Sequence, residues 1–406
     1  MIRLRLWWKR LLPLLLTATL WVPTGSVLAL NDGQQLVVEA WRLVNQSYVD
    51  PAHLEGVHWR QLRQRALEQP IETSEAAYDA ITTMLAPLAD PYTRLLRPND
   101  YKVLRSATQG SVNGIGLQLG SSGPDQRIVA ITALEGSPAA EAGISSGTEI
   151  LEVDGSSAKA MGLETTASRL RGEAGSRVQL VLRSPEGTTR ELLLQRRAVN
   201  LLPVLSRELE QNGKRLGYLR ISQFSEPVPE QVSQILQGFS KRQIDGLILD
   251  LRNNSGGLVE AGLAVANGLL DGQPIVETLD RQGLRDPIQA SPGRWYAGPM
   301  LTLVNGGTAS ASEIVAGALQ DDGRSVLLGS RTFGKGLIQT LIGLGDGSGL
   351  AVTVARYVTP SGRDIQNLGI EPDHRLEQPE PLNPGGAGDT WLQVAQRQLA
   401  DQIGSP

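Results

Sequence analysis

The sequence predicts an α/β protein of several domains, and three observations lead to this prediction. After an apolar leader the chain shows the spacing of amphipathic helices, its middle shows short strands between turns, and its remainder alternates apolar strands with helices. With 406 residues it is long enough for two or three separate cores. We place the expected segments at residues 1–29, 30–105, 106–198, 199–375 and 376–406.

The leader has the pattern of a secretory signal. Four basic residues lie among the first ten, an apolar run follows at residues 11–22, and small residues end at Ala29. The run is shorter than the ~18–20 residues that a spanning helix needs. We therefore expect export and cleavage after Ala29, with an uncleaved anchor as the alternative.

Charge and cysteine content limit the function. Loss of the four basic leader residues from a chain with 38 Lys and Arg and 42 Asp and Glu leaves an acidic protein. That balance argues against nucleic acid as a partner and favours an exported soluble protein that is at most peripheral to a membrane. The chain has no cysteine, which excludes disulfides and a thiol nucleophile.

Residues 30–105 read as helices. Apolar residues from Leu36 to Val44 recur on one helical face, Asp50-Pro51 interrupts the pattern, and two further amphipathic segments follow. The turn Asp-Pro-Tyr-Thr-Arg at residues 90–94 closes the region. By itself this is an ordinary helical cap on a core.

Residues 106–198 read as short strands around a helix. A Gly-Ile-Gly-Leu loop at residues 114–117 opens the unit, strands are expected at 128–131 and 178–182, and a helix at 165–170. Two glycines in this loop match half of a dinucleotide fingerprint, but no acidic residue ends a second parallel strand. We therefore reject dinucleotide binding.

Residues 199–375 contain the strongest parallel-strand signal. The segment 247–251 is apolar almost throughout, as central parallel strands are. It ends in Arg-Asn-Asn-Ser-Gly-Gly at residues 252–257, just before a helix expected at 259–270. Backbone N–H groups at such a turn are able to converge on an anion.

A candidate nucleophile precedes the next helix. Thr308, Ser310 and Ser312 enter a helical pattern whose N-terminus favours an oxyanion, although any helix cap has this composition. Lys335 follows between two glycines. The three histidines, His53, His58 and His374, lie far from this stretch in the sequence, so lysine is the expected base.

The same stretch nearly matches a phosphate-binding P-loop. Gly329 and Gly334-Lys335 have the required spacing, but Gly336 stands where that motif needs Ser or Thr, and strands rather than a helix follow. We therefore reject nucleotide binding.

Several joined blocks resemble the C-terminal processing (tail-specific) proteases, peptidase family S41. The blocks are Thr-Ala-Ser-Ala-Ser-Glu-Ile at residues 308–314, Gln-Asp-Asp-Gly-Arg at 320–324, and Thr-Phe-Gly-Lys-Gly-x-x-Gln at 332–339. Matched position by position, the resemblance implies Ser310 as nucleophile, Lys335 as general base and Gln339 as helper. It also implies an α/β core with a crotonase-like spiral of sheet and helix.

The same resemblance implies an oxyanion hole. One amide comes from Gly256, with Gly257 as the alternative, and the other from Ala311. Ser255 stands where the family often has Pro or Gly, which does not affect a backbone donor.

The middle unit resembles a PDZ domain. The resemblance implies that the amides of Gly114, Ile115, Gly116 and Leu117 bind a peptide's terminal carboxylate, and that the peptide adds as a strand. Arg171 is a candidate sensor of an occupied groove, or equally a surface arginine.

A lysine base needs a dry environment. The ordinary lysine pKa of about 10.4 makes the amine a cation at neutral pH, and burial lowers it. A neutral helper such as Gln339 orients the amine without raising its pKa again. No metal or other cofactor is required.

The resulting prediction is an exported serine endopeptidase that cleaves near substrate C-termini. The N-terminal blocks resemble the photosynthetic members, which implies the photosystem II D1 precursor as substrate and the thylakoid lumen as location. The alternatives are a quality-control protease of the periplasm or envelope, and a non-catalytic PDZ scaffold in which Ser310 only caps a helix. We expect the Pro/Gly-rich segment 376–388 to be loose and Asp389 to cap a last helix.

Overall fold

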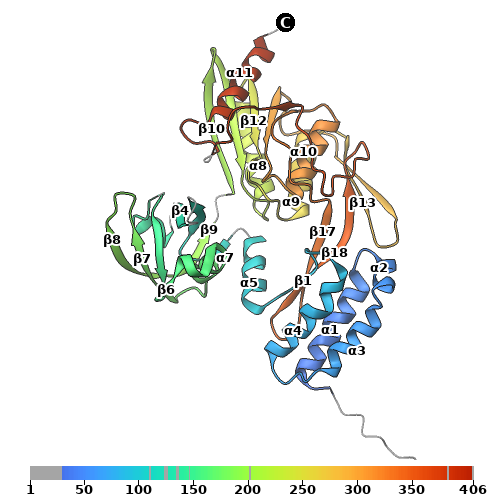
Figure 1. Cartoon of the computed structure of the whole chain (residues 1–406). Helices are drawn as coiled ribbons and strands as arrows, with labels where there is room; N and C mark the ends of the chain where they lie inside the picture. The colour runs from blue at the N-terminus through green and yellow to red at the C-terminus, as the bar shows by residue number, and fades with distance from the viewer. Residues whose placement is uncertain are drawn as a thin grey trace, which may run out of the picture.

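The structure, a computed structural model, describes residues 30–108, 111–122, 127–133, 137–145, 147–200, 203–381 and 384–404. The predicted signal segment, residues 1–29, lies outside the described residues. Figure 1 shows a helical N-terminal region, a strand-rich middle domain to one side, and an α/β part that carries the C-terminus. No helix in the described ranges is both long and apolar enough to cross a bilayer.

The N-terminal region is the predicted set of helices. They are α1 (Asp32–Ser47), α2 (Pro51–Gly56), α3 (Trp59–Glu68), α4 (Ser74–Leu85) and the short 3₁₀ helix η1 (Ala86–Leu88). A capping box begins α1, since Asn31 and Gln34 each accept a hydrogen bond from the other's backbone N–H. The helices bury Val37 and Ile81 at 0 % exposure, together with Leu350 from the distant C-terminal part.

A short strand joins this region to the C-terminal part. Strand β1 (Arg94–Leu96) pairs antiparallel with β18 (Gly349–Val358), so that Arg94 lies opposite Ala351. Helix α5 (Pro98–Thr108) then leads into the middle domain. Besides its helices, which pack on the C-terminal part, the N-terminal region thus contributes one strand to a sheet of that part, which its sequence did not indicate.

The middle domain is a small sheet with one main helix. Its elements are β2 (Ser111–Gly114), β3 (Leu117–Ser122), β4 (Arg127–Ala133), α6 (Pro138–Glu141), β5 (Glu149–Val153), β6 (Ser156–Ser157), α7 (Ala158–Leu170), β7 (Arg177–Arg183), β8 (Thr189–Gln195) and β9 (Arg197–Asn200). The main sheet has the order β3-β4-β5-β7-β8, and β2 pairs with β9. Alternate residues of β7, Val178, Leu180 and Leu182, fill its core.

The C-terminal part is built on a sheet of six strands. They are β10 (Val204–Gln211), β11 (Lys214–Ile221), β12 (Gly246–Asp250), β15 (Met300–Val304), β16 (Val326–Gly329) and β19 (His374–Arg375), in the order β10-β11-β12-β15-β16-β19. Only β10 is antiparallel to its neighbour. A second sheet joins β1, β18, β13 (Pro274–Leu279) and β14 (Arg285–Gln289), with β17 (Leu337–Gly343) also paired to β18.

Helices cover both faces of the six-stranded sheet. Leu247 and Leu249 pack with α8 (Val228–Lys241), α9 (Val259–Leu269) and α10 (Ala311–Asp321). Ile248, on the opposite face of the same strand, packs with Trp391 of α11 (Thr390–Gly404). Burial on both faces explains why β12 is apolar throughout.

The sheet order brings two loops together. Because β12 and β15 are parallel neighbours, the loops that follow them lie at the same edge of the sheet. One contains the Gly-Gly pair at residues 256–257, and the other contains Ser310. Crevices beyond the carboxyl ends of parallel strands are the usual binding sites of such sheets.

A buried ionic cluster ties the C-terminal helix to the first of these loops. The guanidinium of Arg252 donates to Asp250 at 2.6 and 2.9 Å and to Asp389 at 2.6 and 3.0 Å. Arg252 and Asp250 are fully buried. Asp389 also caps α11 by accepting from Leu392 N at 2.9 Å, as predicted.

The expectation that the segment 376–388 is loose was wrong for its described residues. Trp391 donates to the carbonyl of Gln378 at 2.9 Å, and Gly385 N donates to Asp389 at 2.7 Å. Proline and glycine set the local backbone, but distant residues also hold it, since Arg207 donates to the carbonyl of Gly385 at 2.7 Å and Leu376 N donates to that of Gly329 at 2.9 Å.

Asp389→Ala should lower the free energy of unfolding by about 3–5 kcal/mol, because removal of one partner leaves a buried charge incompletely paired. Urea denaturation of the variant measures this loss. Arg375→Ala is the control, since Arg375 and Glu371 form an ion pair at 3.2 Å with side chains 67 % and 57 % exposed. Such exposed pairs contribute about 0–1 kcal/mol. Equal losses in both variants would contradict the assignment of the cluster as a stabilising core feature.

Candidate active site

Ser310 lies between β15 and α10 in an unusual backbone conformation. Its φ is 57° and its ψ is −120°, a region that costs about 1–3 kcal/mol for a residue with a side chain. Its N–H donates to the Glu313 carboxylate at 2.9 Å, and the preceding Ala309 N donates to the carbonyl of Asn254 at 2.9 Å. Ser310 is 8 % exposed at the N-terminus of a helix. Surrounding contacts thus hold a strained serine where an oxyanion is favoured.

The Gly-Gly loop after β12 lies directly against this serine. A Cβ on Gly256 would stand 2.9 Å from Ser310 Cβ and 3.1 Å from Ala311 N, so a larger residue does not fit. A Cβ on Gly257 would stand 2.0 Å from the carbonyl oxygen of Phe224. The fold therefore brings the three predicted residues Ser310, Ala311 and Gly256 together.

The amides of this loop are not all free. Gly256 N donates to the Asn254 side chain at 2.9 Å. Within the described residues, no acceptor is assigned to the N–H groups of Gly257 and Ala311. Of the three candidate amides, those of Ala311 and of the alternative choice, Gly257, thus have no hydrogen-bond partner among the described residues.

Lys335 lies in the turn between β16 and β17, half-buried. Its Nζ is 4.8 Å from the centroid of the Tyr92 ring. Burial is the largest cause that lowers the pKa of Lys335, and the charge of Arg94 adds to it. The carboxylates of Asp90 and Glu313 act against both. No hydrogen bond joins the Lys335 amine to the Ser310 hydroxyl in the part of the chain that is described.

The main chains of Ser310 and Lys335 are joined by one buried carboxylate. Glu313, at 0 % exposure, accepts from Ser310 N and Lys335 N through the same oxygen, each at 2.9 Å. Its other oxygen accepts from Gly334 N at 2.8 Å and from the Thr332 hydroxyl at 2.5 Å. Four donors thus satisfy a carboxylate that would otherwise be costly to bury.

A buried tyrosine joins the same two residues from the carbonyl side. The Tyr357 hydroxyl is 3.0 Å from the carbonyl oxygen of Ser310 and 2.6 Å from that of Lys335. Burial raises the pKa of Tyr357 well above its ordinary value, with the Glu313 charge adding to it. The hydroxyl therefore keeps its hydrogen as a donor, and Glu313 and Tyr357 together fix both backbones.

The predicted helper, Gln339, lies on β17 and faces another partner. Its amide donates to the Thr353 hydroxyl at 3.3 Å, and that hydroxyl donates to Asp90 at 2.7 Å. An irregularity in the β17–β18 pairing falls at Ile338/Gln339. Gln339 thus lies on the strand that follows Lys335. No contact between the side chains of these two residues is found in the described part of the chain.

The predicted carboxylate-binding loop lies at an open sheet edge. Strand β3, which follows it, is the end strand of the middle domain's main sheet, so an added peptide strand has an edge to pair with. Gly116 has a φ of 70°, and a Cβ there would stand 2.2 Å from the Ser137 Cβ. Gly114 forms an antiparallel bridge with Arg171. The fold thus places the candidate sensor next to the predicted loop.

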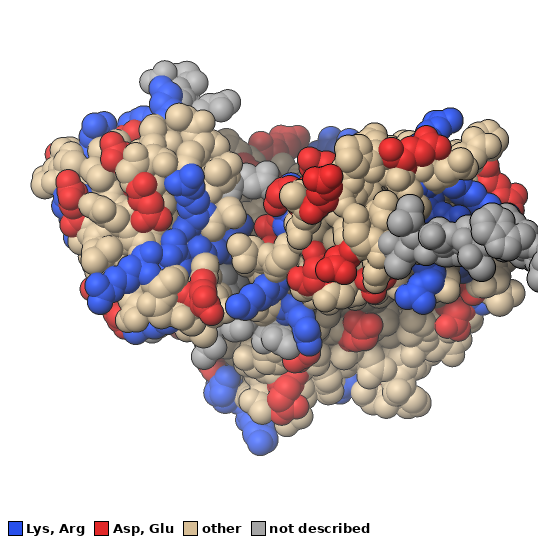
Figure 2. All heavy atoms as spheres, turned by 90° about the horizontal axis from the view of Figure 1, so that it is seen from below, with Lys and Arg blue, Asp and Glu red and all other residues tan. Residues whose placement is uncertain are grey.

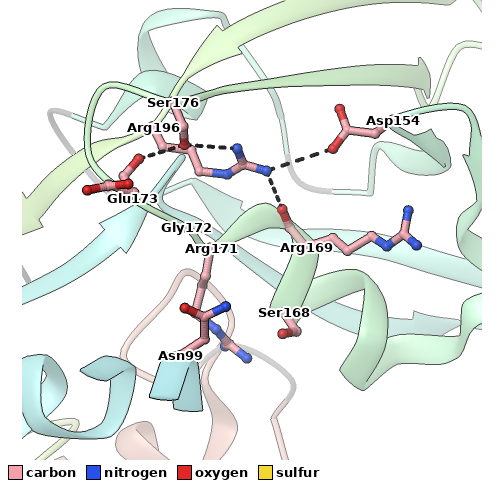
Figure 3. Close-up of a pocket in the computed structure, with 9 residues that line it drawn as sticks. All are labelled: Asn99, Asp154, Ser168, Arg169, Arg171, Gly172, Glu173, Ser176 and Arg196. Carbon is pink, nitrogen blue, oxygen red and sulfur yellow. Dashed lines mark hydrogen bonds and ion pairs between the residues drawn. The ribbon is translucent and has the colours of Figure 1, made fainter. Parts of the chain in front are cut away.

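Arg171 lines a cavity of about 430 Å³ between the middle domain and α5. Figure 3 shows its side chain directed toward Asn99 of α5, away from the buried Arg196. Arg196 donates to the carbonyls of Arg169 at 2.6 Å and Arg177 at 2.7 Å, so its role there is structural. In Figure 2 Lys and Arg side chains form a diagonal band over the lobe at the left, the middle domain. Of the arginines that line this cavity, Arg171 is thus the one whose side chain is directed toward α5.

Sequence reasoning missed Glu313 and Tyr357. The spacing Ser-x-x-Glu from Ser310 to Glu313 is a capping-box signature, so the bond to Ser310 N was predictable. The bonds to Lys335 N and from Tyr357 depend on chain crossings that no local pattern records. Among the described residues no cluster of three or more His, Cys, Asp or Glu is arranged to hold a metal ion.

Glu313→Gln should lower both stability and turnover. An amide offers one acceptor oxygen and an NH₂ group that faces two donors, so buried N–H groups of Ser310 or Lys335 lose their partner. We expect a loss of about 1–3 kcal/mol in the free energy of unfolding. Chemical denaturation and peptide turnover measure the two effects. Glu260→Gln, at an exposed glutamate in the first turn of the neighbouring helix α9, should change neither; a Glu313→Gln enzyme as stable and active as this control would contradict the prediction.

Comparisons with known proteins agree with this architecture. A model of peptidase family S41 matches residues 215–376, and a model of the PDZ domain matches residues 103–183. The carboxyl-terminal-processing protease of Picosynechococcus sp. is 44 % identical over 370 residues, which cover 91 % of this chain and 89 % of that protein. The chloroplastic C-terminal processing peptidase of Tetradesmus obliquus is 43 % identical over 372 residues, covering 87 % and 79 %.

A solved structure gives the same result. The photosystem II D1 C-terminal processing protease superposes with a TM-score of 0.65 at 40 % sequence identity, covering 91 % of this chain and all of that one. Fold, domain order and sequence therefore agree over most of the length. The chain belongs to peptidase family S41, as a carboxyl-terminal-processing protease that carries a PDZ domain.

Proposed function

We propose that this protease uses Ser310 as nucleophile and Lys335 as general base, and that its PDZ domain presents substrate C-termini to them. The observation that carries the assignment is the joint fixation of the two residues, because Glu313 binds both N–H groups and Tyr357 lies between both carbonyls. The lowered pKa of the half-buried Lys335 and the strained backbone of Ser310 support it.

Acylation begins when the neutral Lys335 amine takes the proton of the Ser310 hydroxyl as Oγ attacks the scissile carbonyl carbon. The carbonyl oxygen becomes an oxyanion, which the amides of Ala311 and of Gly256 or Gly257 stabilise by about 3–4 kcal/mol each. The resulting ammonium then gives its proton to the leaving amine. The new C-terminal fragment of the substrate departs, and an ester on Ser310 remains.

Deacylation repeats these steps with water. The Lys335 amine takes a proton from water, whose oxygen attacks the ester, and the proton returns to Ser310 Oγ. Of the two candidate amides, the N–H of Gly256 first has to leave the Asn254 side chain, whereas the N–H of Gly257 has no hydrogen bond to break among the described residues. Gln339 acts as helper through the amide oxygen or N–H that does not bind Thr353.

For the substrate we propose the C-terminal extension of the photosystem II D1 precursor. The proposal is supported by similarity to the photosystem II D1 C-terminal processing protease at 40 % identity over its full length. With this substrate we propose the thylakoid lumen or the periplasm as the location of the enzyme, in agreement with the leader at residues 1–29. Similarity to cyanobacterial and chloroplastic relatives supports that location.

Ser310→Ala should lose labelling by an acylating active-site probe, and mass spectrometry of the wild type should place the acyl group on Ser310. Lys335→Ala should slow peptide turnover by about 10²–10⁴-fold, the usual contribution of a general base. Binding of an uncleaved peptide should persist in both variants, which fluorescence anisotropy measures. Labelling that survives in Ser310→Ala would show that Ser310 is not the nucleophile, and a wild type that is not labelled at all would favour the non-catalytic scaffold.

Gly116→Ala should raise KM for peptides with a free C-terminal carboxylate, because a Cβ there meets Ser137 and strains the loop. Cleavage of a D1-tail peptide is compared between its free acid and its C-terminal amide, with an unrelated apolar tail as a third substrate. The wild type should prefer the D1 free acid, and the variant should lose the preference for acid over amide. Gly155→Ala is the matched control, since its φ is 71° but its Cβ meets nothing within 4 Å. Equal cleavage of both tails by the wild type would indicate the quality-control protease.

A further inference from the structure

The turn at residues 90–94 of the N-terminal region reaches the candidate active site. It lies between η1 and β1 in the sequence, far from Lys335 along the chain. Nevertheless the ring of Tyr92 lies 4.8 Å from Lys335 Nζ. An aromatic face at this distance stabilises the ammonium form of a lysine. The base is thus in contact with a segment outside the matched protease region.

Backbone pairing holds this turn in position. The last residue of the turn, Arg94, is also the first residue of β1, and it lies opposite Ala351 in the pairing of β1 with β18. The Thr93 hydroxyl accepts from Thr353 N at 3.0 Å and donates to Asp90 at 2.7 Å. Because β17 pairs with the same strand β18, the turn and the Lys335–Gln339 segment share one support.

Asp90 is connected to the predicted helper. One of its carboxylate oxygens accepts from the hydroxyls of Thr93 and Thr353, each at 2.7 Å. Thr353 in turn accepts from the Gln339 amide at 3.3 Å. The turn is therefore linked to Gln339 through Thr353, which fixes the direction of one amide N–H of Gln339.

Charges around the amine act in opposite directions. Asp90 on the turn and Glu313 on α10 favour the ammonium form of Lys335. Burial and the guanidinium of Arg94, at the start of β1, disfavour it. Two residues of one short segment, Asp90 and Arg94, thus act on the same amine with opposite sign.

We propose that the turn at residues 90–94 is a positioning element of the active site: Tyr92 and Asp90 hold Lys335 and Gln339 in a resting arrangement, and Arg94 opposes it. The inference rests on the proposed role of Lys335 as base. In the resting arrangement Tyr92, Asp90 and Glu313 favour the ammonium form of the amine, with Nζ over the Tyr92 ring. It must give one proton to solvent and move from the ring before it accepts the proton of Ser310. The N-terminal region therefore controls when the base is available.

The pH dependence of acylation tests this role. Acylation needs the neutral amine, so its rate rises with pH through the pKa of Lys335. Asp90→Asn removes an anion and should move the midpoint of this rise to lower pH. Arg94→Gln removes a cation and should move it to higher pH. Loss of structural support alone does not produce shifts of opposite sign.

Tyr92 provides a second measurement. Tyr92→Leu removes the aromatic face and should move the midpoint to lower pH, whereas Tyr92→Phe keeps the face and should leave it in place. Arg97→Gln is the control, since Arg97 also lies in this region but pairs with Glu75 and Asp79. Rates are measured with the acylating probe on the full chain, and each variant's unfolding curve is recorded under the same conditions.

The outcomes separate the two proposals. Midpoints of Asp90→Asn and Arg94→Gln that stay in place, or that move in the same direction, would overturn the role of the turn. If Lys335→Ala is acylated with the wild-type pH profile, Lys335 is not the base and the proposed function is wrong as well. If Lys335→Ala is not acylated and the midpoints of the turn variants do not move, Lys335 remains the base and only the role of the turn is wrong.

Discussion

The site depends on one buried carboxylate, that of Glu313. It accepts the backbone N–H groups of Ser310 and Lys335 through a single oxygen, and it has no exposure to solvent. An anion in such a position is stable only when donors surround it, and all of its donors come from the two segments that carry the proposed dyad. The charge of Glu313 can therefore be buried only when the segments of Ser310 and Lys335 lie together around it.

This constraint explains why distant parts of the chain meet at Ser310. The sheet order places the loops after β12 and β15 side by side, and glycine at residue 256 allows them to touch. Arg252 in the first loop is paired with Asp389, so the C-terminal helix supports the same edge of the sheet. From the other side, β1 brings the turn at residues 90–94 to Lys335. Two segments outside the matched protease region, the C-terminal helix and the turn at residues 90–94, thus support its geometry.

The sequence was informative where local pattern and chemistry coincide. The apolar run at β12, the capping serine before α10 and the glycines flanking Lys335 each have a local physical cause, and they predicted the strand, the helix start and the turn. It was uninformative where a residue has its partner elsewhere in the chain. The segment 376–388 looked loose because only its composition was visible, whereas bonds to Gln378 and Gly385 hold it. Gln339 was predicted to orient the Lys335 amine, and the sequence did not indicate that its amide N–H donates to Thr353.

The sequence by itself determined the family, the order of the domains and the residues that are candidates for chemistry, because these depend on residue types at short spacing. Only the tertiary structure decided which groups surround the candidates. Glu313, Tyr357 and Tyr92 reach Lys335 through the packing of a helix, a strand and a turn that are far apart in the sequence. The proton affinity of an amine depends on the burial and charge of its neighbours in space. For that reason the local state of Lys335 follows from the fold and not from the residues beside it in the chain.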